Sequence, residues 1–293
     1  MKFKYSYLLL ILFLFPSCAK EEIKREPASF VRGEFLDDWT YNVFVEEGRN
    51  TAFRLWIPEN TTPRAILVLA PGNASSGLTM VNLTEWREYA KKEQLAVIGS
   101  YATSSSDNNN NNLIYALEQI SNKQALPNLL NLPFLLRGHS SGGGFAYHFA
   151  AGFPNKTLAY SNIKGSLSNY NFAMPPGLLI IGAKDLPQRN KYITEGFYSQ
   201  RVQKSLICLA TERLGEHGVG DNDELVRTFF TEILKTRFNT NNELIDISIE
   251  NTFLGNNETN IVLDYKNYLT EKDSASVLVT EKFKNEWLIF VNK

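Results

Sequence analysis

Residues 132–142 read LPFLLRGHSSG, so that an apolar run leads directly into a G-x-S-x-G pentapeptide centred on Ser140. A stretch of small residues that is compatible with a helix follows at 143–151. This order predicts a strand, a sharp turn and a helix, with the hydroxyl of Ser140 at the top of a sheet. Glycines flank the serine because a side chain there would collide with the neighbouring strand and helix. The pentapeptide is a weak signal by itself, so its meaning depends on the rest of the chain.

From residue 65 onward the chain alternates apolar runs with segments of helical spacing. The predicted strands are 65–70, 95–101, 132–136, 158–163, 178–182 and 205–210, and the predicted helices are 83–93, 113–120, 143–151, 188–203 and 221–236. Such alternation is typical of an α/β fold with a mostly parallel central sheet and helices on both faces. The run at 65–70 is apolar throughout, as in a central strand that is covered on both sides. Segments 41–45 and 52–57 flank a polar turn and predict an N-terminal antiparallel hairpin.

Two stretches depart from this alternation. The serine- and asparagine-rich tract that follows 95–101 and ends at Asn112 is expected to be a surface loop, because five consecutive asparagines do not build a packed core. Residues 239–293 contain polar turns, a short alternating piece and an amphipathic segment at 282–291. We expect them to form a C-terminal extension packed across the edge of the sheet, since an independent binding module would need a larger core. The main domain is therefore predicted at 37–238.

Composition limits the classes of function. The chain has 293 residues, 43% of them hydrophobic, which is enough for one sizeable core. A net charge of -1 provides no basic face for nucleic acid. The second of the two cysteines, Cys208, lies in an apolar run, where a buried strand thiol is expected.

The N-terminus resembles an export signal. Two lysines precede an apolar block at 7–15, which is too short for a comfortable membrane span, and residues 1–17 are expected to be cleaved. The end of the block resembles a bacterial lipoprotein signal, in which Cys18 is lipidated and becomes the mature N-terminus. The resemblance implies an exported protein held at a membrane of the cell envelope by a lipid anchor, with residues 18–36 as a tether. The tract at 19–22 also resembles one that marks lipoproteins for the outer-membrane surface, whereas an ordinary cleaved signal with an incidental cysteine is the alternative.

A serine hydroxyl needs a base to take its proton, and the base needs a third group to orient it. The chain has three histidines. His139 lies inside the predicted turn and His148 lies in the helix that follows, so local structure explains each of them. His217 lies in a loop after the last predicted strand of the sheet, where the carboxyl ends of parallel strands gather, and it is the candidate base.

The acid that orients His217 is expected between Ser140 and His217 in the chain, at the carboxyl end of a strand. Asp185 has this position, since it follows the apolar run 178–182. Asp185 would bind the proton-bearing nitrogen of His217, fix its tautomer and stabilise the imidazolium. Three other acids are explained by helix ends or by a helix surface: Asp221, Asp223 and Glu195.

Acyl transfer also needs donors for an oxyanion. The backbone N–H of Ser141, which follows the serine, is one candidate. The second is expected from the small-residue loop after 65–70, with Asn73 as the first choice and Gly72 as the next.

Residues 41–238 resemble the α/β-hydrolase superfamily. The order Ser140, Asp185, His217 matches the family order of nucleophile, acid and base, and the loop at 71–77 matches the family's oxyanion loop. The resemblance implies a Ser-His-Asp hydrolase that uses neither a metal nor an organic cofactor. Residues 161–176 are too few for the lid that many lipases insert there, so the chain looks closer to dienelactone-hydrolase-like enzymes and to secreted carbohydrate or feruloyl esterases. The loop lacks the His-Gly-Gly-Gly of many lipases and esterases, which leaves the substrate class open.

We therefore expect a serine hydrolase that cleaves carboxylic esters through an acyl-enzyme on Ser140. A soluble small ester or a carbohydrate ester, acetylated or feruloylated, fits a site without a lid. The same triad serves peptidases and thioesterases. A catalytically inactive lipoprotein that uses the hydrolase fold for binding is the alternative from a different class.

Overall fold

The computed structural model describes residues 29–32, 39–44, 52–72, 75–101, 107–124, 126–241 and 243–293. The expected signal segment, Cys18, most of the expected tether and Asn73 lie outside these described residues. Ser29–Arg32, which was expected to belong to the tether, instead forms a strand that pairs antiparallel with Trp39–Phe44. Within the described ranges, no helix combines the length and the apolar character needed to cross a lipid bilayer.

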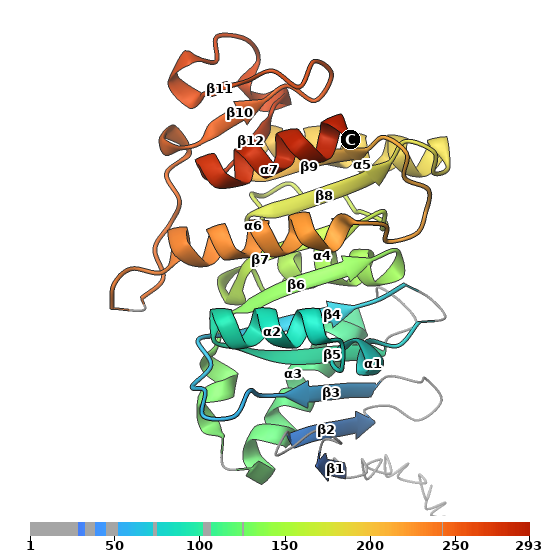
Figure 1. The fold of residues 1–293 in the computed structure, drawn as a ribbon, viewed down its shortest axis with the longest axis vertical. Helices are drawn as coiled ribbons and strands as arrows, with labels where there is room; N and C mark the ends of the chain where they lie inside the picture. Colours follow the sequence, from blue (N-terminus) through green and yellow to red (C-terminus); the bar gives the residue numbers. More distant parts are fainter. Residues whose placement is uncertain are drawn as a thin grey trace, which may run out of the picture.

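A nine-stranded sheet forms the centre of the molecule (Figure 1). In spatial order its strands are β1 (Ser29–Arg32), β2 (Trp39–Phe44), β3 (Ala52–Trp56), β5 (Leu95–Tyr101), β4 (Ala65–Ala70), β6 (Phe134–His139), β7 (Thr157–Ile163), β8 (Gly177–Gly182) and β9 (Ile207–Glu212). The strands β5, β4, β6, β7, β8 and β9 are mutually parallel. Strands β1, β2 and β3 pair antiparallel with one another, and β3 joins β5 antiparallel. The expected α/β class and the N-terminal antiparallel hairpin are confirmed.

Helices cover both faces of the sheet (Figure 1). They are α1 (Gly77–Met80), α2 (Thr84–Glu93), α3 (Asp107–Gln124), α4 (Ser141–Gly152), α5 (Pro187–Val202), α6 (Asn222–Arg237) and α7 (Glu281–Asn292). In the central strand β4, Ile66 and Val68 pack into the core that contains α3, α4 and α5, while Leu67 and Leu69 pack into the core that contains α2, α6 and α7. All six residues of β4 are buried, because successive side chains of a strand point to opposite faces and both faces are covered here.

The asparagine-rich tract differs from the sequence expectation. Helix α3 begins at Asp107 and includes the five asparagines, so the predicted loop was wrong for 107–112; residues 102–106 lie outside the described part of the chain. Asparagine is a poor helix former, but the buried stripe of Leu113, Ala116, Leu117 and Ile120 anchors the helix on the sheet. Asn112 itself is buried beside this stripe. Tertiary packing overrode the local preference.

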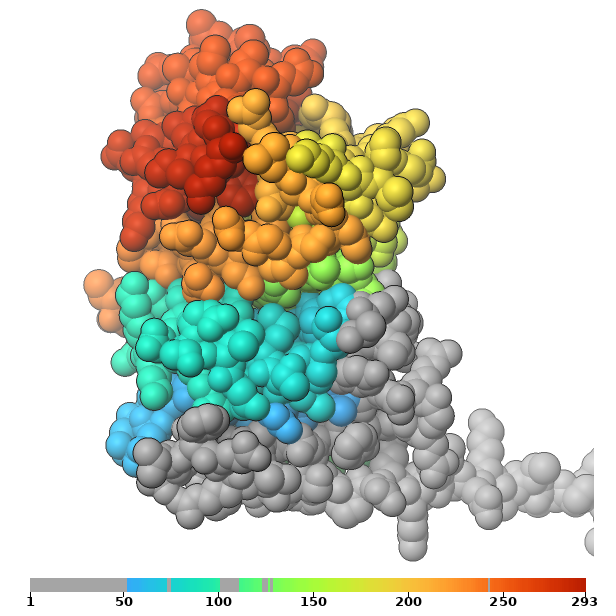
Figure 2. Space-filling view, turned by 45° about the vertical axis from the view of Figure 1, so that its right-hand side comes forward, coloured from blue at the N-terminus to red at the C-terminus, as the bar shows by residue number. Residues whose placement is uncertain are grey.

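The C-terminal segment packs on the edge strand β9. It forms a small sheet in the order β11 (Val262–Asp264), β10 (Phe253–Gly255), β12 (Ser276–Leu278), followed by α7. The indole of Trp287 donates a hydrogen bond to the Leu209 carbonyl (2.9 Å), and the Ser276 hydroxyl accepts one from the Leu209 N–H (2.7 Å). These side chains satisfy backbone groups at the exposed edge of β9, and Figure 2 shows α7 in close contact with α6 at the surface.

Short 3₁₀ helices complete the described structure. They are η1 (Pro127–Asn131), η2 (Pro154–Lys156), η3 (Ile249–Asn251), η4 (Tyr265–Asn267) and η5 (Lys272–Ser274).

Candidate active site

Strand β6 passes into α4 through a sharp turn at Ser140. The residue has φ 53° and ψ -119°, a backbone conformation that is strained for any residue with a side chain. The Ser140 N–H donates to the Ile163 carbonyl of β7 (2.8 Å), which holds the turn against the sheet. A Cβ added at Gly138 would lie 2.1 Å from the Gly142 carbonyl oxygen, and one at Gly142 would lie 2.1 Å from the Ala70 carbonyl oxygen. Both glycines are therefore required by the close approach of three backbones.

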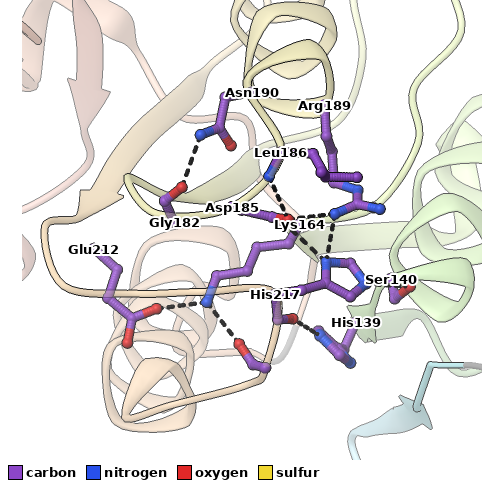
Figure 3. Close-up of polar contacts among 12 residues, drawn as sticks. His139, Ser140, Lys164, Gly182, Asp185, Leu186, Arg189, Asn190, Glu212 and His217 are labelled. Carbon is purple, nitrogen blue, oxygen red and sulfur yellow. Dashed lines mark hydrogen bonds and ion pairs between the residues drawn. The ribbon is translucent and has the colours of Figure 1, made fainter.

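The structure brings Ser140, His217 and Asp185 together (Figure 3). The distance from Ser140 Oγ to His217 Nε2 is 2.9 Å, and the distance from His217 Nδ1 to Asp185 Oδ2 is 3.0 Å. The three residues follow the carboxyl ends of β6, β9 and β8, which meet at one edge of the parallel sheet. The His217 side chain is 40% exposed, whereas that of Asp185 is 2% exposed. The acid is thus shielded, whereas the imidazole is partly open to solvent.

Asp185 is surrounded by donors. Its Oδ1 accepts a hydrogen bond from the Leu186 N–H (2.7 Å) and forms an ion pair with Arg189. Burial raises the pKa of the Asp185 carboxyl, but the hydrogen bonds from His217 and Leu186 and the charge of Arg189 together outweigh it, and the pKa lies below its usual value. Asp185 is therefore ionised at neutral pH and can accept a hydrogen bond from the Nδ1–H group of His217.

Two side chains at the carboxyl ends of the neighbouring strands β6 and β7 hold the loop that carries His217. His139 Nε2 lies 2.7 Å from the His217 carbonyl oxygen, so this nitrogen carries the proton and donates it. Burial is the main reason that the pKa of His139 is lowered, which keeps the ring neutral. Lys164 donates to the Gly218 carbonyl and to Glu212 Oε2, both at 2.6 Å (Figure 3). The loop is thus fixed from two sides.

The sequence reading missed the role of these supporting residues. His139 was explained by local structure, yet its partner lies 78 positions away. Lys164 directly follows β7 and Glu212 is the last residue of β9, 48 positions away, and no local pattern connects them. Arg189 lies four residues after Asp185, a spacing at which oppositely charged side chains meet along a helix, so this signal was available.

Two of the three oxyanion candidates lie beside Ser140. Ser141 is the first residue of α4, and N–H groups in the first turn of a helix have no acceptor within the helix. A Cβ added at Gly72 would lie 3.0 Å from Ser140 Cβ and 3.0 Å from His139 Nδ1, so the loop after β4 passes close to the serine. The first-choice residue, Asn73, is outside the described residues.

The remaining polar candidates have structural partners. Asp223 pairs with the buried Arg137 (2.7 Å), Glu195 lies 3.8 Å from Lys191 on the surface of α5, and His148 Nδ1 lies 2.7 Å from the Tyr170 hydroxyl. Asp221 differs from these three, because it is the N-cap residue of α6 but its side chain makes no capping hydrogen bond.

The described part of the chain contains no group of three or more His, Cys, Asp or Glu side chains that could hold a metal ion. Cys208 is buried in β9, as expected, and burial raises the pKa of its thiol. The thiol is therefore not activated as a nucleophile.

No protein-family model matches the chain, and no curated protein sequence matches it. Among solved structures, an esterase from the archaeon Pyrobaculum calidifontis matches with a TM-score of 0.52 and 12% identity, over 72% of this chain and 86% of that one. The fluorophosphonate-binding serine hydrolase FphF of Staphylococcus aureus matches with a TM-score of 0.49 and 18% identity, over 71% and 99% of the two chains. A dienelactone hydrolase from Anabaena variabilis matches with a TM-score of 0.48 and 22% identity, over 68% and 97%.

Identities this low bear on the fold alone. The mostly parallel sheet, the serine turn between β6 and α4, and the similarity to the archaeal esterase agree on the same architecture. The chain has the α/β-hydrolase fold.

Proposed function

We propose that the protein is a serine hydrolase that cleaves carboxylic esters through an acyl-enzyme on Ser140. The observation that carries this proposal is the continuous chain of contacts from Ser140 Oγ through the His217 ring to Asp185, built on a strained turn. Serine, histidine and aspartate in this arrangement suit acyl transfer, because each supplies what the preceding group lacks.

In the first half of the reaction, Ser140 Oγ attacks the ester carbonyl carbon while His217 Nε2 takes the hydroxyl proton. Asp185 stabilises the imidazolium that forms. The Ser141 N–H and backbone N–H groups of the loop after β4 are the proposed donors to the oxyanion, each worth about 3 kcal/mol of barrier. His217 then protonates the departing alcohol. Water repeats these steps on the acyl-enzyme and releases the acid.

The short segment between β7 and β8 and the exposure of His217 support a soluble substrate. Only a short segment separates β7 from β8, and His217 is partly exposed. We propose a small ester or a carbohydrate ester that carries an acetyl or feruloyl group. A panel of esters that varies the acyl length, and that includes acetylated and feruloylated sugars, tests this class.

The activity itself is tested with protein lacking residues 1–18. Its turnover of p-nitrophenyl acetate is compared with that of Ser140→Ala, and a fluorophosphonate probe is expected to label only the wild type. A wild type that is no faster than Ser140→Ala and takes up no probe would favour a binding role. Activity on peptides or acyl thioesters that exceeds activity on all esters would move the proposal to those substrates.

We also propose export and lipid anchoring through Cys18, on the basis of the signal at residues 1–17. Palmitate labelling of the protein in a bacterial host should be lost in Cys18→Ala. Unchanged labelling would contradict the anchor.

A further inference from the structure

Arg189 brings a guanidinium group to the edge of the triad (Figure 3). The residue lies in the first turn of α5, four positions after Asp185. Its Nη1 forms an ion pair with Asp185 Oδ1 and lies 2.9 Å from His217 Nδ1. The two nitrogens lie this close because both donate to the same carboxylate, Nη1 to Oδ1 and the Nδ1–H to Oδ2 at 3.0 Å. Arg189 therefore lies beside the imidazole and leaves the hydrogen bond between His217 and Asp185 intact.

Most of the hydrogen-bonding capacity of Arg189 is unused. A guanidinium carries five N–H donors in a planar fork. Among the residues that the structure describes, only Asp185 and His217 lie within hydrogen-bonding distance of it, and both lie at Nη1. Nε and Nη2 have no partner in this part of the chain, and the side chain is 29% exposed. Arg137 binds the Asp223 carboxylate with the same two atoms, at 2.8 and 2.7 Å, so the free edge of Arg189 suits a carboxylate.

The charges around Arg189 also favour an anionic ligand. Asp185 is one carboxylate that faces both Arg189 and His217. When His217 takes the hydroxyl proton it becomes an imidazolium, and Asp185 then has two cations to compensate. Within the described ranges no second acid contacts Arg189, and Glu195 on the same helix lies 3.8 Å from Lys191 instead. A negative group on the substrate would supply the second compensating charge.

The order of the strands decides which part of an ester would meet Arg189. The loop after β4, which supplies proposed donors to the oxyanion, and Arg189, which follows β8, lie on opposite sides of β6. Strand β6 leads into Ser140. Because His217 protonates the departing alcohol, the alcohol oxygen has to lie at His217 Nε2. With the carbonyl oxygen of the ester directed toward the β4 loop, the alcohol portion lies on the side of Arg189.

We propose that Arg189 is a specificity-determining residue that binds a carboxylate on the alcohol portion of the ester through Nε and Nη2. This inference rests on the proposed function and narrows its substrate class to esters of acidic alcohols, such as hydroxy acids and sugar acids. The chemical steps at Ser140 stay as described above. Arg189 acts by holding the leaving group beside His217 Nε2, where the group receives its proton.

Two acetate esters that differ in one charge test this role. They are 3-acetoxybenzoate and methyl 3-acetoxybenzoate, and the measured quantity is the ratio of their kcat/KM values. We expect this ratio to fall about tenfold from the wild type to Arg189→Met, because a charge-assisted pair is lost. Any disturbance of the triad acts on both esters and cancels in the ratio. The matched control is Lys191→Met, which removes an exposed cation from the same helix and should keep the ratio of the wild type.

A fall of less than about threefold in Arg189→Met, or an equal fall in Lys191→Met, overturns the inference even when p-nitrophenyl acetate is hydrolysed. Arg189→Gln is the second neutral variant, used if Arg189→Met does not fold.

Binding of the acidic alcohol itself needs no turnover. If the wild type hydrolyses none of these esters, the proposed function fails, and an NMR titration with 3-hydroxybenzoate decides the role of Arg189. We expect the Kd to rise about tenfold in Arg189→Met, whereas the Kd of methyl 3-hydroxybenzoate should stay the same. Equal Kd values for 3-hydroxybenzoate in the two proteins overturn the inference.

Discussion

Replacement of Lys164 by methionine tests how the His217 loop is held in place. The Lys164 side chain is fully buried and donates at 2.6 Å to Glu212 Oε2 and to the Gly218 carbonyl. Lys164 also has a φ of 55°, but methionine has a side chain of similar length and pays the same backbone cost. The substitution therefore removes the charge and its two hydrogen bonds and keeps the packing.

The expected loss of stability in Lys164→Met depends on the Glu212 carboxylate, which loses its partner. Removal of one partner of a buried ion pair costs about 3–5 kcal/mol, because the other charge stays buried without compensation. The Glu212 side chain keeps 21% exposure and a hydrogen bond from Asn222 at 3.2 Å, so its charge remains partly compensated. We expect the free energy of unfolding to fall by about 3 kcal/mol, at the low end of this range.

Urea unfolding followed by circular dichroism measures this loss. In the double variant Lys164→Met with Glu212→Leu the uncompensated charge is absent, so at least half of the lost stability should return. Lys191→Met is the control, because its ion pair is exposed, and its free energy of unfolding should change by less than about 0.5 kcal/mol.

Activity should fall as well, since a displacement of His217 by about 1 Å can cost about 100-fold in rate. A loss below about 1 kcal/mol in Lys164→Met, or a double variant no more stable than the single one, would show that this ion pair does not fix the loop.

Three further predictions concern the serine turn and its neighbours. Ser140→Ala should lower kcat for p-nitrophenyl acetate by about 10⁴-fold or more without a change in the unfolding midpoint, and retention of a tenth of the activity would exclude Ser140 as the nucleophile. Gly142→Ala should lower the free energy of unfolding by about 2 kcal/mol or more, because its Cβ would lie 2.1 Å from the Ala70 oxygen, whereas Gly218→Ala, with nothing within 4 Å, should be tolerated; equal losses would contradict the close approach. The pKa of His139 is lower in the folded chain than its usual value of 6.5. Below pH 6.5 the unfolded chain therefore binds a proton that the folded chain does not, and the free energy of unfolding should fall as the pH drops from 7 toward 5. Thermal unfolding of His139→Gln should show a weaker fall over the same range, and an identical slope would argue against a buried neutral His139.

Much of the fold was accessible from the sequence because the signals are local. Apolar runs predicted the parallel strands, and the strand that precedes Ser140 ends within three residues of its predicted end. The asparagine tract shows where local reasoning fails, since residues 108–112 have poor helix propensity and are nevertheless helical. The packing of Leu113 and Ile120 on the sheet decided that segment, and no window of sequence contains the sheet.

The candidate site also contains residues that could be predicted from the sequence and contacts that could not. Ser140, Asp185 and His217 could be named from the sequence, because each follows the end of a predicted strand and parallel strands bring such ends to one edge. The contacts of His139 with the His217 carbonyl, of Lys164 with Glu212, and of Arg189 with His217 could not be named.

The strands, the helices that follow the hydrophobic pattern and the glycine-flanked serine could thus be predicted from the sequence, since periodicity and turn chemistry act over a few residues. The contacts that side chains make across the sheet edge, such as that of Arg189 with the His217 imidazole, could be seen only in the folded molecule. Those contacts join residues as many as 78 positions apart, and hydrogen bonds and ion pairs at such separations depend on where whole strands and helices lie.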